Sequence, residues 1–269
     1  MEAACHLFHL VESRLLNMRE SLPAALDVGI ISAMQDFSNL VLTNLKVELT
    51  AGQLQLFKRY EELLTEWNQK FNLTAIAEPE GIRLKHFYDS LTCLRVIQDI
   101  SAAIIDVGCG AGFPGIPLKI VRPDFRLTLV ESVGKKAEFC SEVVKQLGLR
   151  DVAILHARVE DLGQDLSHRE KYDWAVARAL APMPVLAEYL LPLVCIGGSV
   201  LAQKGSSARL ELEQAAGAIT LLGGEVEQVD EFELPGLKEK RALIKIGKRK
   251  PTPPKFPRKA GLPSKNPLT

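Results

Sequence analysis

The sequence lacks the cysteine spacing of a zinc site or a disulfide framework. Its five cysteines are scattered, with no CxxC pair and no histidine at metal-ligand spacing. Thiols in this arrangement are typical of a protein that works in a reducing compartment. We therefore expect a cytoplasmic protein that holds no metal ion.

The sequence also lacks long apolar runs and targeting signals. No run reaches the roughly 18 apolar residues of a membrane span, and residues 1–33 carry only Arg14 and Arg19 as basic side chains. A secretory signal and a transit peptide are both disfavoured, and we expect no contact with a membrane. Residues 1–45 form an N-terminal extension with two open interpretations, a helix or a segment that precedes a true start at Met34.

The sequence has no net charge, because 33 basic side chains balance 33 acidic ones. The balance hides an asymmetry, since residues 238–269 hold eleven Lys and Arg against Glu239 alone, a net charge of +10. Six prolines within residues 248–269 predict an extended basic arm without regular structure. Such an arm indicates contact with a polyanion, although a solvated tail without a partner has the same composition.

Most of the chain alternates between helical and strand patterns. Apolar side chains three and four residues apart predict a helix with Thr50 as its N-cap and with Trp67 as a packing residue. The expected strands are 104–107, 127–131, 152–156, 174–177, 199–203, 225–234 and 241–247. The expected helices between them are 116–121, 135–147, 184–193 and 210–219.

This order predicts an α/β fold with a doubly wound, mostly parallel sheet and helices on both faces. The last two strands could pair antiparallel around Pro235-Gly236. We expect one domain over residues 46–247, whose first part, 46–100, is a helical cap.

The segment Ile104–Pro117 carries the most informative motif. A strand with Asp106 near its end passes into glycines at every second position, Gly108, Gly110 and Gly112, and then into the start of a helix. Glycine permits positive φ and a close approach to a ligand, and a helix start offers free N–H groups. The motif predicts a nucleotide-like cofactor at the carboxyl end of the first parallel strand.

Two cofactor classes fit this loop. Residues 110–115 match G-x-G-x-x-G, the fingerprint of nicotinamide-dependent dehydrogenases, and residues 106–112 match the acidic loop of S-adenosylmethionine enzymes. Glu131 would accept hydrogen bonds from ribose hydroxyls in either class. Asp106 favours S-adenosylmethionine, because its carboxylate would repel a pyrophosphate but not a cationic cofactor. A module that binds cofactor or RNA without catalysis is the other open alternative.

A histidine, an aspartate and a serine lie within five residues, at His86, Asp89 and Ser90. A hydrolase triad is gathered from separate loops, and the G-x-S-x-G elbow is missing. We expect a helix cap or a turn here, and the residues alone assign no chemical role to the three side chains.

Several short blocks, in this order, are more specific than the glycine loop: Trp67-Asn68, Asn72-Leu73-Thr74, His86–Leu91, Asp106–Pro117, Glu131–Lys136, Arg158–Glu160, Ala177–Ala179, Lys204-Gly205 and Pro257–Pro263. With them the chain resembles the 16S ribosomal RNA guanine-N7 methyltransferases, also called glucose-inhibited division protein B. The resemblance runs from about Tyr60 to the end of the sequence. Cys109 is a mild departure, since many members of that family have Ser or Thr there.

The resemblance implies a Rossmann-like class I fold, S-adenosyl-L-methionine as cofactor, and methylation of guanine N7 in 16S rRNA of the small ribosomal subunit. Within it, Gly108 and Phe113 would line the methionine and adenosine portions, Glu131 would hold the ribose, and Val159 and Glu160 would border the adenine. Together with the glycine loop, the expected cofactor site comprises Asp106, Gly108, Gly110, Gly112, Phe113, Glu131, Val159, Glu160 and Arg178.

The same resemblance places Arg178 beside the methyl donor and the incoming base, as the catalytic residue. Guanine N7 has a lone pair and no proton, so no general base is required, and alignment would supply most of the catalysis. The target guanine must be accessible, because A-form grooves hide N7. The expected RNA contacts are Arg158, Lys204, Arg258 and Lys259, and we expect the protein to act as a monomer.

Overall fold

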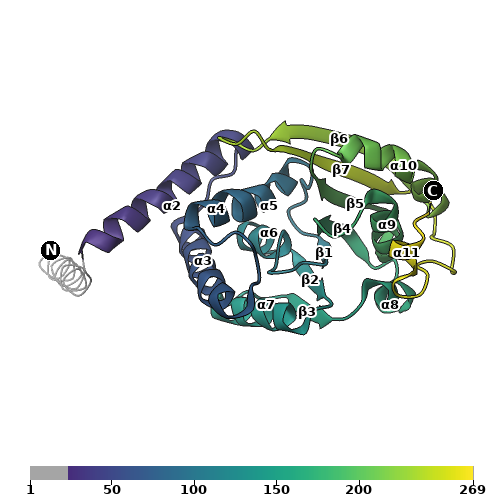
Figure 1. Cartoon of the computed structure of the whole chain (residues 1–269), viewed down its shortest axis with the longest axis horizontal. Coiled ribbons are helices and arrows are strands. Elements are labelled where there is room, and N and C mark those ends of the chain that lie inside the picture. The colour runs from purple at the N-terminus through teal and green to yellow at the C-terminus, as the bar shows by residue number, and fades with distance from the viewer. Residues whose placement is uncertain (1–23, 269) are drawn as a thin grey trace, which may run out of the picture.

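The computed structural model describes residues 24–268, which fold around one seven-stranded sheet (Figure 1). The strands lie in the order β3-β2-β1-β4-β5-β7-β6. β1 to β5 are parallel, and β7 is antiparallel to both β5 and β6. Their bounds are β1 (Ala103–Val107), β2 (Arg126–Glu131), β3 (Val152–His156), β4 (Tyr172–Arg178), β5 (Val194–Lys204), β6 (Gly224–Glu233) and β7 (Lys240–Lys248).

The predicted doubly wound sheet is confirmed, and so is the antiparallel pair around Pro235-Gly236. The chain winds from β1 outward to β2 and β3 and then returns to place β4 on the other side of β1. A ligand crevice is expected where the winding reverses, between β1 and β4. β5 begins at Val194, earlier than the expected start at residue 199, because Gly197-Gly198 forms an irregularity within the strand and does not end it.

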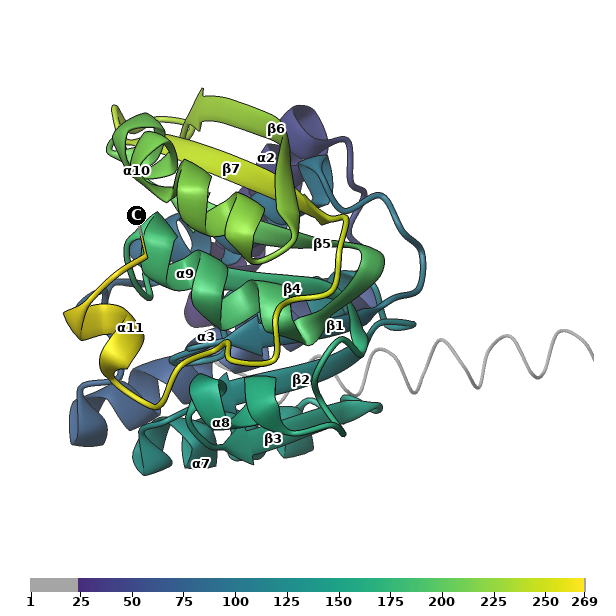
Figure 2. The same cartoon turned by 90° about the vertical axis from the view of Figure 1, so that its right-hand side faces the viewer.

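Helices cover both faces of the sheet, and alternate residues of β1 divide between two cores (Figures 1 and 2). Ile104 packs in the core under α3, α6 and α7, while Ile105 packs in the core under α8, α9 and α10. This division follows from the two-residue period of a strand buried on both faces. The bounds are α3 (Ala51–Phe71), α6 (Gly115–Val121), α7 (Gly134–Gln146), α8 (Val159–Gln164), α9 (Met183–Leu190), η3 (Leu191–Leu193) and α10 (Ala208–Leu221).

The helical cap precedes the sheet and packs on one face of it. Thr50 accepts a hydrogen bond from the N–H of Gln53 in a capping box, as predicted for the start of α3. Trp67 packs against the rings of Phe71 and Phe139, which confirms it as a packing residue. The cap also contains α2 (Ala24–Leu45), α4 (Pro79–Gly81), η1 (Ile82–Tyr88), α5 (Asp89–Leu91) and η2 (Thr92–Arg95).

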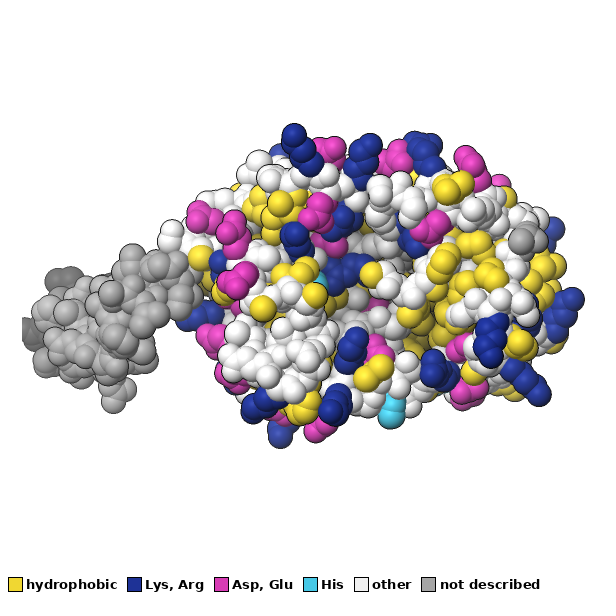
Figure 3. Space-filling model, in the orientation of Figure 1, with side chains coloured by type: hydrophobic (Ala, Val, Ile, Leu, Met, Phe, Trp, Pro, Cys, Tyr) yellow, Lys and Arg dark blue, Asp and Glu magenta, His cyan; other side chains and the backbone are white. Residues whose placement is uncertain are grey.

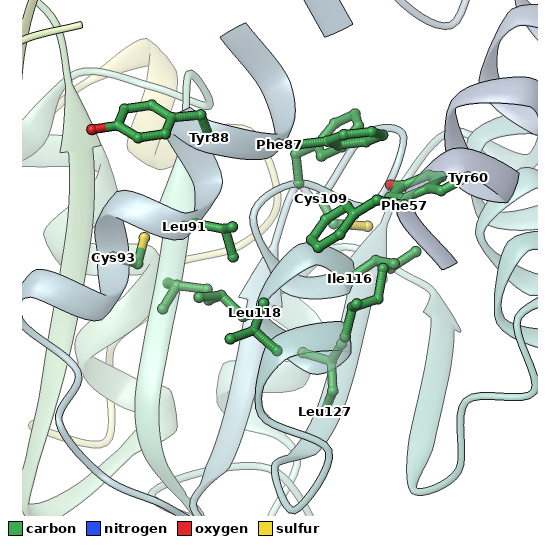
Figure 4. Close-up of a cluster of buried hydrophobic side chains, with 14 of the residues drawn as sticks. Phe57, Tyr60, Phe87, Tyr88, Leu91, Cys93, Cys109, Ile116, Leu118 and Leu127 are labelled. Carbon is green, nitrogen blue, oxygen red and sulfur yellow. The ribbon is translucent and has the colours of Figure 1, made fainter. Parts of the chain in front are cut away.

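An aromatic cluster joins the cap to the glycine loop (Figure 4). The ring centroid of Phe87 lies 5.1 Å from that of Phe57 and 5.2 Å from that of Tyr60. All three side chains are buried, and Ile116 of α6 belongs to the same core. Large buried aromatic side chains contribute several kcal/mol each, roughly 3–5 when truncated to Ala. This packing therefore fixes η1 of the cap against the glycine loop that follows β1.

The N-terminal extension is described only from residue 24 onward. The described part is helical, because α2 runs continuously from Ala24 to Leu45 and passes through Gly29. Residues 1–23 of the predicted extension lie outside the described residues. None of the described helices is long and apolar enough to cross a membrane.

Residues 249–268, which we call the C-terminal strap, correct the prediction of an extended arm. Figure 2 shows this yellow segment leaving β7, passing α9 and α8, and forming the short helix α11 (Leu262–Lys265) before it turns back toward α9. Thr252, Phe256 and Pro257 are buried. The prolines exclude long helices but not packing, because the carbonyls of this segment find side-chain donors on the body of the protein. Lys248 is also buried, as the last residue of β7.

Candidate active site

The glycine loop after β1 has the tight backbone that the sequence predicts. Gly108 has φ of +68° and Gly112 has φ of +94°, in the region that favours glycine. A Cβ atom on Gly108 would lie 2.5 Å from Cδ1 of Leu180, so a larger residue would displace that side chain. The N–H groups of Gly108 and Cys109 donate to the carbonyl of Val130, which ties the loop to the end of β2.

The cap also holds this loop directly. The buried hydroxyl of Tyr60 donates to the carbonyl of Ala111. The ring of Phe113 is stacked between Tyr60 and His86, with centroids 5.4 and 4.5 Å away. Phe113 is 4% exposed and lies in the aromatic cluster, not on a cavity wall. The second half of the loop is therefore a packed support, not a flexible lid.

A first cavity opens at the carboxyl ends of β1, β2 and β3. We call it the β1–β3 cavity, and its volume is about 230 Å³. It holds Gly108, Val159 and Glu160 of the expected cofactor residues and Arg158 of the expected RNA contacts. The complete lining is Val107, Gly108, Val130, Ser132, Ala157, Arg158, Val159, Glu160, Leu180, Ala181, Tyr189 and Ser264.

Glu131 stands at the end of β2, next to this lining. Its Oε2 accepts a hydrogen bond from Gly110 N at 2.9 Å, and its Oε1 accepts one from Val133 N at 2.8 Å. The side chain is almost fully buried. Each carboxylate oxygen can accept a second hydrogen bond. These contacts therefore orient Glu131 and leave it able to accept further hydrogen bonds.

Asp106 lies beneath the loop and not in the cavity, which differs from its expected place beside the cofactor. Its Oδ2 accepts a hydrogen bond from Gly115 N at 2.7 Å, and its Oδ1 is buried without a partner. Burial raises the pKa of this carboxyl to about 7. Asp106 thus anchors the start of α6, and Gly112 likewise contributes to the loop without lining the cavity.

A second cavity, of about 410 Å³, opens at the carboxyl ends of β4 and β5. We call it the β4–β5 cavity. Basic and acidic side chains gather around a hollow near the middle of the face in Figure 3. The lining is Lys85, His86, Asp89, Arg178, Ala179, Gln203, Lys204, Gly205, Ser207, Glu211 and Arg241.

Arg178 is the centre of a polar network in this second cavity. Its Nη1 donates to Asp89 Oδ2 and to the carbonyl of Lys85, both at 3.1 Å. Its guanidinium carbon lies 5.0 Å from the ring centroid of Phe113. Arg241 donates from Nε to the other oxygen of Asp89 at 3.2 Å. The nearly buried carboxylate of Asp89 therefore orients two arginines at one wall of the cavity.

His86 is held as a neutral hydrogen-bond acceptor toward Arg178. Nη2 of Arg178 lies 3.2 Å from His86 Nδ1, and Nε2 of His86 lies 2.8 Å from Thr74 Oγ1. A guanidinium can only donate, so Nδ1 is the acceptor and Nε2 carries the proton toward Thr74. Burial, with the positive charge of Arg178 as the second cause, lowers the pKa of His86 to about 3.

These contacts correct the prediction of a local cap or turn at His86–Ser90. The segment is the interior of a helical run, and Asp89 pairs with residues about 90 and 150 positions later in the chain. The contributions of His86, Asp89 and Arg241 to the network were missed. For His86 and Asp89 the only sequence signal was the His86–Leu91 block itself. For Arg241 the sequence held no signal.

The loop after β4 separates the two cavities. Ala179 lines the β4–β5 cavity, while Leu180 and Ala181 line the β1–β3 cavity. Ala179 has φ of +52°, an uncommon value for a residue with a side chain. Arg178 therefore stands directly before a strained residue on the shared wall.

The expected RNA contacts fall into two groups. Arg158 and Lys259 are exposed. Lys204 lies 2.5 Å from Glu211 Oε2, and Arg258 lies 2.5 Å from the fully buried Glu188 Oε2. Arg158 and Lys259 can therefore contact a polyanion, whereas Lys204 and Arg258 each form an ion pair with a carboxylate of the protein.

Comparison with known proteins decides the family. Residues 53–243 match the family model described as rRNA small subunit methyltransferase G. The chain belongs to this family. A ribosomal RNA small subunit methyltransferase G from Acetivibrio thermocellus is 50% identical over 223 residues, which cover 83% of this chain and 92% of that protein.

A second small subunit methyltransferase G, from Desulforamulus reducens, is 46% identical over 225 residues, covering 83% of this chain and 94% of that protein. Family membership makes the fold a Rossmann-like class I methyltransferase fold and the cofactor S-adenosylmethionine. Both the glycine loop and the Arg178 network lie within the matched residues, but the C-terminal strap lies outside them.

Proposed function

We propose that this protein uses S-adenosylmethionine to methylate N7 of a guanine in 16S rRNA of the small ribosomal subunit. Membership of the small subunit methyltransferase G family supports the reaction. The structural observation that supports the proposal is that two cavities lie on the two sides of one short loop, with Arg178 at its start. One cavity would hold the methyl donor and the other the base.

The β1–β3 cavity would hold the cofactor. The polar groups present fit it, because the close backbone at Gly108 and the buried carboxylate of Glu160 in the first turn of α8 line the cavity, and the buried carboxylate of Glu131 at the end of β2 adjoins it. Glu131 would accept hydrogen bonds from ribose hydroxyls, and Val159 and Glu160 would border the adenine. When bound, S-adenosylmethionine supplies an activated methyl group on a cationic sulfur. Gly110, Gly112, Phe113 and Asp106 would act by holding the loop in place.

The β4–β5 cavity would hold the target guanine. N7 carries a lone pair in the plane of the ring, so the protein has to align this atom and does not have to remove a proton. Arg178 is unsuited to stabilise the positive charge that the guanine acquires, and it would instead donate hydrogen bonds to the base or to a phosphate. The neutral state of His86 gives Arg178 an uncharged hydrogen-bond acceptor on that side of the cavity.

RNA outside the cavities would meet exposed basic side chains. Arg158 and Lys259 are the strongest candidates for phosphate contacts, because neither forms an ion pair with a described residue. Lys204 and Arg258 would contribute less, since a phosphate would have to compete with Glu211 and Glu188.

The function is tested by incubating the protein with 16S rRNA, with small-subunit particles and with S-adenosylmethionine, and then mapping modified nucleotides by mass spectrometry. We expect one methylated guanine, with the methyl group at N7. Titration with NADH addresses a dehydrogenase, for which we expect no binding. Cofactor binding without any mass increase in either RNA substrate would instead indicate a non-catalytic module.

A further inference from the structure

The C-terminal strap is fastened to the body of the protein at successive points. The guanidinium of Arg169 donates to the carbonyls of Thr252 and Phe256, both at 2.7 Å. Gln164 Nε2 donates to the carbonyls of Pro254 at 3.2 Å and Pro257 at 2.8 Å. Side chains of the body thus take the place of secondary structure in satisfying strap carbonyls.

Arg258 makes the strongest of these attachments. Its backbone N and its Nε donate to Glu188 Oε1 at 2.8 and 2.9 Å, and its Nη2 donates to Oε2 at 2.5 Å. Glu188 has no solvent exposure, and Arg258 is its ion-pair partner. A buried carboxylate is costly without a cation, so α9 and the strap depend on each other here.

Beyond Arg258 the strap reaches the β1–β3 cavity. The backbone N of Gly261 donates to Glu160 Oε1 at 2.9 Å. The hydroxyls of Ser264 and Tyr189 lie 3.0 Å apart. Glu160, Tyr189 and Ser264 all line the cavity, so its wall combines α8, α9 and α11. Hydrophobic side chains also gather on the right-hand side of the molecule in Figure 3, the side on which Figure 1 labels α11.

We propose that the C-terminal strap is a wall of the cofactor site, on its adenine side, and that strap docking and cofactor binding are coupled. This inference rests on the proposed placement of the cofactor in the β1–β3 cavity. The exocyclic amine of adenine is a hydrogen-bond donor. Glu160, Tyr189 and Ser264 bring acceptor oxygens to one end of the cavity, and the strap contributes the last of them and orients the first.

Coupling follows from this geometry without a large motion. A cofactor that contacts Ser264 and Glu160 favours the docked strap over any detached state. By linkage, a docked strap must favour the bound cofactor by the same factor. The strap would then affect binding of the cofactor as well as contact with RNA.

The test uses the full chain and measures the affinity for S-adenosylhomocysteine by calorimetry. Ser264→Trp places a large ring in the cavity, and we expect at least about tenfold weaker binding, which corresponds to roughly 1.4 kcal/mol. Lys265→Trp, one residue further on the same short helix and exposed, is the matched control with unchanged affinity. Binding of RNA to Ser264→Trp in the absence of cofactor should equal that of the unchanged protein.

Glu131→Gln separates failure of this inference from failure of the cavity assignment. Weakened binding in Glu131→Gln with normal binding in Ser264→Trp would overturn the role of the strap and keep the cofactor in the β1–β3 cavity. Normal binding in both variants would overturn both proposals.

A measurement on the unchanged protein covers the case in which Ser264→Trp fails to fold. Hydrogen exchange of the amides in residues 258–266 should slow when S-adenosylhomocysteine is added, because the ligand holds the strap docked. Exchange that stays the same at saturating ligand, while the glycine loop becomes protected, would overturn the coupling.

Discussion

Arg178 and Asp89 form an ion pair across 89 residues of sequence, with Nη1 and Oδ2 3.1 Å apart. The carboxylate is almost fully buried and binds Arg241 with its other oxygen. Because His86 accepts from the second terminal nitrogen of Arg178, the guanidinium is held at two edges. The arginine is thus oriented before any substrate arrives, which is the condition for catalysis by alignment.

Asp89→Asn should impair the reaction by releasing this orientation. We expect kcat/KM for rRNA methylation to fall by about 10²-fold, the cost of a misplaced group near the reacting atoms, while affinity for S-adenosylhomocysteine changes little. Glu239→Gln is the matched control, because it removes another partner of Arg241 and leaves Arg178 paired. Single-turnover methylation gives the comparison. Equal rates for Asp89→Asn and the unchanged protein would exclude a positioning role for Asp89.

Arg178→Ala should reduce methylation at least as strongly as Asp89→Asn. The variant lacks the side chain that we propose to align the base or a phosphate. Arg178→Lys keeps the charge but loses the planar fork, so partial activity is expected. The measurement is methyl transfer together with calorimetric cofactor affinity. Full methylation and full affinity in Arg178→Ala would show that this residue has no part in the site.

Arg258→Gln and Lys259→Gln should have opposite consequences although they are neighbours. Loss of Arg258 leaves Glu188 buried without its cation, and we expect a loss of about 3–5 kcal/mol in the free energy of unfolding. Loss of the exposed Lys259 should leave stability unchanged and lower the slope of log affinity for RNA against log salt by about one. Urea unfolding and salt titrations of RNA binding measure the two effects, and the reverse pattern would contradict both assignments.

Tyr60→Phe should destabilise the protein by leaving the carbonyl of Ala111 without its buried donor. The expected loss is about 1–3 kcal/mol in the free energy of unfolding. Tyr88→Phe is the control, since Tyr88 is also buried but its hydroxyl bonds to no other described residue. Urea titration measures both variants. A smaller loss for Tyr60→Phe than for Tyr88→Phe would argue against the tie between cap and loop.

Asp106→Asn should remove a pH dependence of stability. Burial raises the pKa of Asp106 to about 7 from 3.8, so between these values the folded state holds a proton that the unfolded state has lost. The contribution of Asp106 to stability is therefore full below about pH 4 and falls as the pH rises toward 7. The lowered pKa of His86 acts in the opposite direction below pH 6.5, so the two proteins must be compared at each pH.

The difference between the Asp106→Asn and unchanged proteins isolates the carboxyl. We expect the variant to gain stability relative to the unchanged protein between pH 5 and pH 8, as measured by urea unfolding without cofactor. An Asn side chain can still accept from Gly115 N. A constant difference across this range would show that Asp106 does not titrate there.

Local patterns predicted most of the sheet and its flanking helices. Alternating burial and the glycine turns are short-range features, so all seven strands were predicted, with end errors of at most two residues except at the start of β5, which lies five residues earlier than predicted. Residue spacing could not show that Asp89 meets Arg178 and Arg241, because only the completed sheet brings these three segments together. The strap was mispredicted for a related reason, since its prolines exclude hydrogen-bonded ladders but not the side-chain donors Gln164 and Arg169.

The alternation within β1 has a consequence for alignment. Ile104 and Asp106 face the core under α3, α6 and α7, while Ile105 faces the other core. A slip of one residue along the sheet would turn Asp106 away from Gly115 and shift the glycine loop by about 3.3 Å. A buried carboxyl with one partner contributes little stability, but a register that moved it away from Gly115 N would leave it with no partner at all. Asp106 therefore favours the native register, in which the glycine loop after β1 and Arg178 at the end of β4 lie on neighbouring strands.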